Sequence, residues 1–213
     1  MQKSKSKSPP RWGLERGLYR SGVNLVCGVD EAGRGPLAGP VVAAAVIFPP
    51  AMFISGVDDS KRLSPSKRNL LYRRILGSSL EVGVGIIGPD YIDQHNILQA
   101  SLEAMRLAVE SLTVNPKLIL VDGNRSIPDT DLPQRTVISG DRKCHAIASA
   151  SIVAKVTRDL LMMELHRFYP QYDFFNNKGY PTPAHAEGLR SFGPCPIHRK
   201  SFKFHHTRLT DWP

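Results

Sequence analysis

Cysteine is scarce in this chain of 213 residues, and long apolar runs are lacking. The three cysteines, Cys27, Cys144 and Cys195, are widely spaced and form no Cys-x-x-Cys pair, which argues against a disulfide framework or a cysteine zinc site. No apolar stretch approaches the ~20 residues of a membrane-spanning helix, and no apolar signal-peptide core follows the N-terminal lysines. We therefore expect a protein of the reducing cytoplasm with no membrane partner.

Acidic residues are few relative to basic ones. The chain has 19 Asp and Glu against 28 Lys and Arg, which gives a net charge of +9. This excess favours a polyanionic partner, nucleic acid before membrane, although a solvated basic surface would give the same count. With 41% hydrophobic and 22% charged residues, the chain is long enough to form one substantial core.

The N-terminal segment differs in composition from the rest. Residues 1–20 carry six basic residues and one acid, Glu15, with Lys-Ser alternation and a Pro9-Pro10 pair. We predict a flexible basic tail over residues 1–22, which is either a nucleic-acid contact or a solvated extension. Residues 23–169 then form the main domain. Residues 170–213, rich in Gly, Pro, aromatic and basic residues, form a C-terminal helical appendage.

Strand-like and helix-like segments alternate along the main domain. Apolar runs bounded by turn residues predict strands over 25–30, 41–48, 81–87, 118–121 and 134–138, the first two forming a hairpin. Ser64 as an N-cap before Pro65 predicts a helix over 65–76, and Asp90 as a cap predicts a long helix over 90–112. Further helices are predicted over 145–168 and, as a short one, over 182–192. This order indicates an α/β or α+β domain with a mixed sheet flanked by helices.

The segment 28–40 holds the first candidate site. Asp30 and Glu31 come at the end of a predicted buried strand, immediately before a glycine-rich turn. Carboxylates suit a hard cation such as Mg²⁺ or Mn²⁺, whereas the bare amides of the turn and Arg34 suit a phosphate or a sugar.

Two other interpretations of this segment exist. Gly33, Gly35 and Ala38 match a Gly-x-Gly-x-x-Ala dinucleotide-binding loop, but such a loop should open a helix, and here prolines and a β-rich run follow. Asp30 and Glu31 would also repel a pyrophosphate. The plainest alternative is a charged turn with no role.

Two further acids follow predicted strands. Asp122 comes after the strand over 118–121, and Asp141 after the strand over 134–138, so acids from three segments lie at strand ends, where open sheets build sites. Asp122 as a turn residue and Asp141 as a helix-capping residue are the alternatives. Asp159 competes with Asp141, but an i,i+4 pair with Lys155 is enough to explain Asp159.

The sequence Gly-Val-Asp-Glu-Ala-Gly-Arg-Gly at 28–35 resembles the signature of the ribonuclease HII family, the type 2 ribonucleases H. Val-Asp-Gly-Asn at 121–124 and Gly-Asp at 140–141 are similar to the second and third acidic motifs of that family, and the resemblance extends to about residue 202. It implies a ribonuclease H-like fold with a C-terminal appendage. It also implies that Asp30, Glu31, Asp122 and Asp141 are the catalytic residues and bind divalent ions, Mg²⁺ or Mn²⁺, two at the active site.

The same resemblance implies how the substrate is read. Backbone groups of Gly33, Arg34 and Gly35 would bind the ribose 2′-hydroxyl, and Tyr180 would lie at the RNA–DNA junction, although a packed aromatic is the alternative for Tyr180. Candidate phosphate contacts, each with a solvated cation as its alternative, are Lys61, Lys143, Lys178 and Arg199, and His198 beside Arg199 is a further one.

The function implied by the resemblance is hydrolysis of the RNA strand of RNA/DNA hybrids and nicking on the 5′ side of single ribonucleotides in duplex DNA. The products would carry 3′-hydroxyl and 5′-phosphate ends, as needed in ribonucleotide excision and primer removal. We expect a monomer with no obligate protein partner, and no room before the first strand for the extra domain of the related ribonuclease HIII. The rivals are a non-catalytic nucleic-acid-binding module and a dinucleotide enzyme.

Overall fold

A mixed five-stranded sheet forms the centre of the computed structural model, which describes residues 12–204 and 207–208. The strands β1 (Val26–Ala32), β2 (Val41–Ile47), β3 (Glu81–Ile87), β4 (Leu118–Asp122) and β5 (Gln134–Val137) lie in the order β3-β2-β1-β4-β5. The β1–β2 and β2–β3 pairs are antiparallel, whereas β1–β4 and β4–β5 are parallel. The predicted α/β class and mixed sheet are therefore confirmed.

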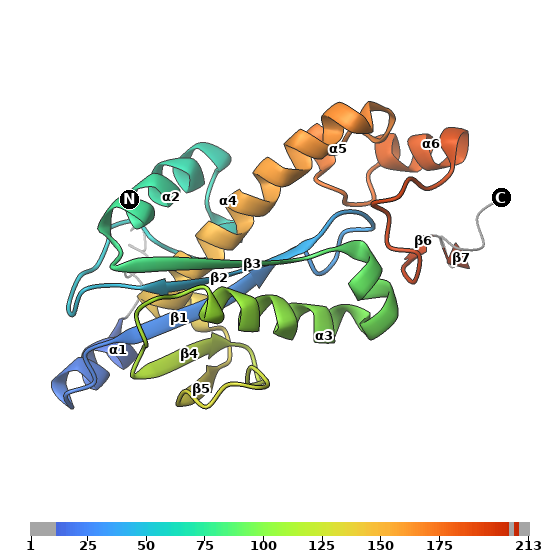
Figure 1. The fold of residues 1–213 in the computed structure, drawn as a ribbon. Helices are drawn as coiled ribbons and strands as arrows, with labels where there is room; N and C mark the ends of the chain where they lie inside the picture. Colours follow the sequence, from blue (N-terminus) through green and yellow to red (C-terminus); the bar gives the residue numbers. More distant parts are fainter. Residues whose placement is uncertain (1–11, 205–206, 209–213) are drawn as a thin grey trace, which may run out of the picture.

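Helices cover both faces of this sheet (Figure 1). Helix α3 (Pro89–Glu110) packs on one face, against side chains such as Val29 and Ala45, while α2 (Pro65–Ser78) and α4 (His145–Phe168) pack on the other, against Ala44 and Val46. Strand β2 is buried along its whole length, as its continuous Val and Ala run requires of a central strand with two covered faces. None of the helices in the described residues has the length and apolar character needed to span a bilayer.

The register of the parallel strands places the first acids side by side. Val29 of β1 pairs with Val121 of β4, so the next residues, Asp30 and Asp122, are neighbours at the carboxyl ends of the two strands. Val137 of β5 pairs with Asp122, and the chain then enters η2 (Gly140–Arg142), which carries Asp141. Strand pairing alone thus brings three segments of the chain to one edge of the sheet.

Two helix starts follow their predictions, and one does not. Ser64 caps α2 by accepting a hydrogen bond from Lys67 N, and Thr182 caps α6 (Pro183–Phe192) in the same way through His185 N. Asp90 was expected to cap the long helix, but α3 begins at Pro89 without a side-chain cap. The helix is kinked at Asn96, whose Oδ1 accepts from Leu98 N and Gln99 N and so caps the segment beyond the kink.

The N-terminal segment departs from the prediction of a tail. Residues 1–11 lie outside the described residues, but α1 (Gly13–Arg20) is an ordered helix. Glu15 is buried, and its carboxylate accepts hydrogen bonds from His145 N at 2.6 Å and Ala146 N at 2.7 Å. Glu15 therefore caps the N-terminus of α4 from a distant part of the chain, which composition could not reveal.

The C-terminal part lies at the far end of α4 (Figure 1). The helices η3 (Pro170–Tyr172), α5 (Phe174–Asn177) and α6 follow α4, and a small hairpin of β6 (Lys203–Phe204) and β7 (Thr207–Arg208) lies beyond them. Tyr172, Phe174 and Leu189 form an apolar cluster with Leu37 and Met162. This cluster joins the C-terminal part to the glycine-rich turn after β1.

Candidate active site

The four predicted acids line one cavity of about 200 Å³. Asp30 and Glu31 project from β1, Asp122 from the end of β4, and Asp141 from η2. The same cavity is bordered by further residues from the glycine-rich turn, η1, α4 and the C-terminal part, namely Ala32, Gly33, Arg34, Gly35, Ser60, Lys61, Ser151, Lys155 and Tyr180. The structure thus brings the acids and the predicted ribose-reading residues into a single site.

Asp30 is the most deeply buried of the acids, with 6% of its surface exposed. Its Oδ1 accepts a hydrogen bond from Glu31 N at 2.7 Å. Burial raises the pKa of Asp30 well above its usual range, and the nearby carboxylates of Glu31 and Asp122 raise it further, while a hydrogen bond with Ser151 opposes them. Ionising Asp30 therefore costs free energy, and a bound cation would remove that cost.

The other acids lie in related surroundings. Burial raises the pKa of Glu31, and the Arg34 guanidinium, 3.2 Å from Glu31 Oε1, counteracts this. The Asp122 carboxylate accepts a hydrogen bond from Gly140 N at 2.7 Å, which fixes the turn that carries Asp141. The pKa of Asp141 is raised by burial and then by the carboxylates of Asp59 and Asp122.

The donor set fits a hard divalent cation. In residues 12–204 and 207–208, no three His, Cys, Asp or Glu side chains stand close enough together to hold one ion. The four carboxylates nevertheless converge on one cavity, and mutual repulsion and burial raise the pKa values of Asp30, Glu31 and Asp141. Oxygen ligands of this kind suit Mg²⁺ or Mn²⁺, whose charge would relieve the repulsion.

Asp59 is a further buried acid near the site, and the sequence analysis did not single it out. It is 3% exposed and caps η1 (Ser60–Arg62) by accepting from Lys61 N at 3.0 Å. Its other oxygen lies 3.4 Å from Arg142 Nη2. Asp59 thus holds the segment that carries Lys61 to the rim of the acidic cavity, and the Asp-Ser-Lys run was the only available signal of such a cap.

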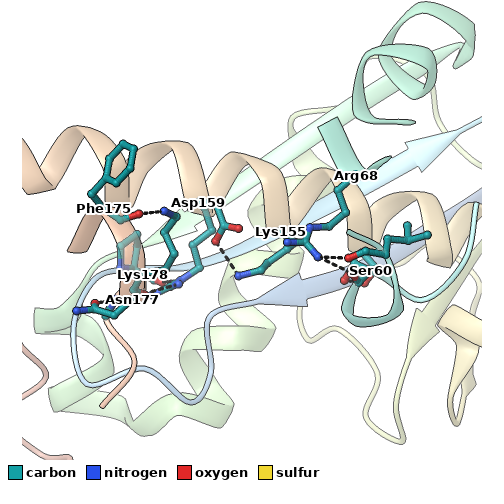
Figure 2. A network of polar contacts seen from close by, with 12 residues as sticks. Ser60, Arg68, Lys155, Asp159, Phe175, Asn177 and Lys178 are labelled. Carbon is teal, nitrogen blue, oxygen red and sulfur yellow. Dashed lines mark hydrogen bonds and ion pairs between the residues drawn. The ribbon is translucent and has the colours of Figure 1, made fainter. Parts of the chain in front are cut away.

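Asp159 lies outside the acidic cavity. It lines a neighbouring cavity of about 360 Å³, and its Oδ1 accepts from Lys155 Nζ at 2.7 Å, as the i,i+4 spacing predicted. Figure 2 shows this pair between Arg68 on one side and Lys178 on the other. Lys155 and Tyr180 line both cavities, so they form the boundary between the two.

Tyr180 lies against the glycine-rich turn without being enclosed. The residue is 43% exposed, and a Cβ placed on Gly35 would be 3.7 Å from Tyr180 Cε1. Lys155 Nζ is 5.8 Å from the centre of the ring, within the range of a cation–π contact. An aromatic face beside Gly35 is thus available at the mouth of the acidic cavity, which argues against Tyr180 as a core residue.

The structure places the predicted phosphate contacts in different surroundings. Lys61 borders the acidic cavity, Lys178 borders the neighbouring one, and Lys143 is exposed with its Nζ donating to Ile138 O at 2.6 Å. Lys178 Nζ donates to Phe175 O. Arg199 contradicts the prediction, because its side chain is fully buried and donates to backbone carbonyls.

His198 is likewise buried rather than open to phosphate. Its Nε2 is 2.9 Å from His185 Nε2, and its Nδ1 is 3.1 Å from Cys195 Sγ. Burial lowers the pKa of His198 to about 4, so this imidazole is neutral at physiological pH. A run of basic residues in the sequence does not reveal which of them face inward.

A mixed sheet with helices on both faces and a cluster of carboxylates at its strand ends is the architecture of a ribonuclease H-type nuclease. The family model of ribonuclease HII matches residues 27–205. The chain belongs to the ribonuclease HII family, as the motifs predicted.

Relatives and solved structures agree with this assignment. The chain is 53% identical over 192 residues to the ribonuclease HII of Geobacter metallireducens, covering 90% of each chain. It resembles the crystal structure of ribonuclease H2 from Pyrococcus horikoshii with a TM-score of 0.70 and 28% identity, over 84% of this chain and 94% of that one. It also resembles a PCNA:RNase HII complex from Archaeoglobus fulgidus with a TM-score of 0.71 and 27% identity, over 88% and 99% of the two chains.

Proposed function

We propose that this chain is a metal-dependent endonuclease that cleaves the RNA strand of RNA/DNA hybrids and nicks on the 5′ side of single ribonucleotides in duplex DNA. The observation that carries the proposal is the convergence of Asp30, Glu31, Asp122 and Asp141 on one cavity beside the Gly33–Gly35 turn. Four acids would weaken phosphate binding by a non-catalytic module, so their presence favours catalysis over simple nucleic-acid binding.

The four carboxylates would hold two divalent ions, Mg²⁺ or Mn²⁺. When bound there, such ions would supply Lewis acidity for the attacking water and for the leaving oxygen, and hydrolysis of that bond would leave 3′-hydroxyl and 5′-phosphate ends. Asp122 is oriented by Gly140 N, and Glu31 by Arg34, so both acids are held before substrate arrives. Lys61 at the rim supplies positive charge for a substrate phosphate.

The remaining parts would select the ribonucleotide. The backbone of the Gly33–Gly35 turn would bind the 2′-hydroxyl, the feature that distinguishes RNA from DNA. The Tyr180 ring would rest on the sugar or base at the junction, since it is exposed and borders the acidic cavity. Because Tyr180 belongs to the part after α4, we propose that residues 170–213 act as a substrate-binding appendage to the catalytic domain.

We further propose that the enzyme works as a monomer in a reducing cytoplasm. Cys27, Cys144 and Cys195 are free and buried, which supports the reducing compartment. Light scattering of the purified protein at micromolar concentration should give the mass of one chain, and a stable dimer would contradict the monomer.

Cleavage of a defined duplex tests the proposed function. A duplex with one ribonucleotide should be cut at the 5′ side of that nucleotide with Mg²⁺ or Mn²⁺, and left intact with a chelator. An all-DNA duplex of the same sequence is the control and should stay whole. The proposal fails if neither ion supports cutting, or if the all-DNA duplex is cut equally well.

A further inference from the structure

Two fully buried arginines lie behind the glycine-rich turn. Arg158 comes from α4 and Arg199 from the segment after α6, and each has no exposed surface. Neither guanidinium forms an ion pair with a carboxylate in the part of the chain that the structure describes. A buried charge without a counter-charge is costly, so these residues require an explanation.

Backbone carbonyls replace the missing counter-charge. Arg199 donates from Nε to Gly39 O at 3.0 Å, from Nη1 to Arg34 O at 3.0 Å and from Nη2 to Gly33 O at 2.5 Å. Arg158 donates from Nε to Pro40 O at 2.9 Å, from Nη1 to Lys178 O at 3.0 Å and from Nη2 to Ala38 O at 3.0 Å. Five of the six acceptors belong to residues 33–40.

Both arginines keep their charge under physiological conditions. Burial lowers the pKa of Arg158 to about 10, and burial followed by the neighbouring Arg158 lowers that of Arg199 to about 9. Both values remain above neutral pH, so the turn carbonyls face two cations. A guanidinium presents several donors in a fixed plane, which suits it to holding several carbonyls at once.

Because peptide groups are planar, holding the carbonyl groups also fixes the direction of the N–H groups on the opposite side of the turn. The described peptide bonds are all trans, so the N–H of Arg34 points away from the carbonyl of Gly33, and the N–H of Gly35 away from that of Arg34. With both carbonyls directed at Arg199, the two N–H groups face the opposite way. No hydrogen bond within the described residues uses either of them, and both residues border the acidic cavity.

The glycine at position 33 makes this arrangement possible. Gly33 has a φ of +98°, and a Cβ there would lie 2.1 Å from Arg158 Nε. A side chain at this position would therefore displace the arginine as well as strain the backbone.

We propose that Arg199, supported by Arg158, is a positioning residue for ribose recognition: it holds the carbonyls of Gly33 and Arg34 inward so that the N–H groups of Arg34 and Gly35 face the acidic cavity as donors to the 2′-hydroxyl. This inference rests on the proposed function, and it assigns Arg199 a role without contact with the substrate. A purely structural role, in which the arginines only attach the C-terminal part, is the competing account.

Substitution by lysine separates the two accounts. Arg199→Lys keeps the charge but lacks the several donors of the planar guanidinium, so the backbone N–H groups of Arg34 and Gly35 lose their fixed direction. Fluorescence anisotropy titrations, with Ca²⁺ in place of the catalytic ion, would give the affinity for a single-ribonucleotide duplex and for an all-DNA duplex of equal sequence. The preference of Arg199→Lys for the ribonucleotide duplex should fall at least about fivefold, the effect of one hydrogen bond, while its affinity for all-DNA duplex stays within about twofold.

Two further variants provide an intermediate case and a control. Arg158→Lys should reduce the preference less, because Arg158 does not contact the carbonyls of Gly33 or Arg34. Arg106→Lys on α3, where the arginine pairs with Glu103 and Glu110 on the surface, should leave the preference unchanged. An unchanged preference in a folded Arg199→Lys protein overturns the proposal, and so does an equal loss on both duplexes.

A measurement on the unmodified protein covers the case in which Arg199→Lys does not fold. The backbone amide resonances of Arg34 and Gly35 should shift more with the ribonucleotide duplex than with the all-DNA duplex, and equal shifts contradict the proposal. Cleavage by the unmodified protein distinguishes the failures. If it cuts at the ribonucleotide and the Arg199→Lys preference is unchanged, only this inference fails. If it does not cut, the proposed function fails as well.

Discussion

Asp30 shows at the residue scale what the site costs the fold. Burial and two neighbouring carboxylates raise its pKa, so the folded protein holds this proton to higher pH than the unfolded chain does. The stability that Asp30 contributes is therefore complete below its ordinary pKa of 3.8 and is lost as the pH rises through the raised value. Above that raised pKa the ionised side chain of Asp30 destabilises the metal-free protein.

Asp30→Asn should consequently raise the melting temperature of the metal-free protein at about pH 8, and the gain should vanish near pH 4. Thermal unfolding across this range, in chelator, measures the effect. Added Mg²⁺ should stabilise the wild type more than the variant. A variant that melts below the wild type at about pH 8 would show that Asp30 is a structural residue.

Tyr180 tests how the junction is read. Tyr180→Phe should lose one hydrogen bond, about 0.5–1.5 kcal/mol, and Tyr180→Ala a further ~1–3 kcal/mol if a base stacks on the ring. Steady-state kinetics should show the larger loss on a single embedded ribonucleotide than on a long hybrid, because neighbouring 2′-hydroxyls in the hybrid offer other registers.

Tyr172→Phe is the matched control for Tyr180. Tyr172 is buried, and its hydroxyl donates to Gly193 O at 2.7 Å, so its loss should lower the melting temperature without changing the substrate preference. Tyr180 would be a packing residue if its variants also melted earlier and lost activity equally on both substrates.

At the scale of elements, the contact between β1 and α4 positions the first acids. A Cβ on Gly28 would lie 2.2 Å from the backbone carbonyl carbon of Ala146, so only glycine permits this close approach. Gly28→Ala should destabilise the protein by about 1–3 kcal/mol, as overpacking does, and reduce activity by moving the strand that carries Asp30.

Gly77→Ala on α2 is the control for that prediction. Nothing lies within 4 Å of a Cβ at Gly77, so alanine there should stabilise the helix by about 0.5–1 kcal/mol. Chemical denaturation measures the free energy of unfolding of both variants. Equal stabilities for the two would mean that β1 and α4 can separate without cost.

Helix α1 supports the same N-terminal end of α4 through Glu15. Glu15→Ala removes the acceptor for two buried N–H groups and should cost about 1–3 kcal/mol. Glu164→Ala, which removes only a surface pair with Arg167, should change the stability little. If both substitutions had the same small effect in urea unfolding, Glu15 would not be a cap.

The elements themselves were largely predictable, because local signals specify them. The apolar run over 41–48 and the Ser64-Pro65 start gave β2 and α2 with near-correct bounds. Composition failed for α1, since its single acid is held by amides more than a hundred residues away. The kink at Asn96 was also missed, because Asn is read equally well as an ordinary helix residue.

At the scale of the whole molecule, the candidate site was predictable where it depends on strand ends. The acids lie at or just beyond the carboxyl ends of β1, β4 and β5, and they meet at one edge because these strands pair in parallel. The sequence did not distinguish inward from outward cations: Arg199 and His198 face the interior, because the turn carbonyls and His185 bind them there. Such long-range partners are set by the fold, not by spacing.

The measurement that tests the account most directly compares kcat for Asp141→Asn and Asp159→Asn on a single-ribonucleotide duplex. Asp141 lines the cavity with the other three acids, whereas Asp159 pairs with Lys155 next to it. Asp141→Asn should lower kcat about 10²-fold or more, and Asp159→Asn less than about tenfold, with both melting near the wild type. The opposite order, an inactive Asp159→Asn and a nearly normal Asp141→Asn, would contradict the assignment of the catalytic centre to the acidic cavity.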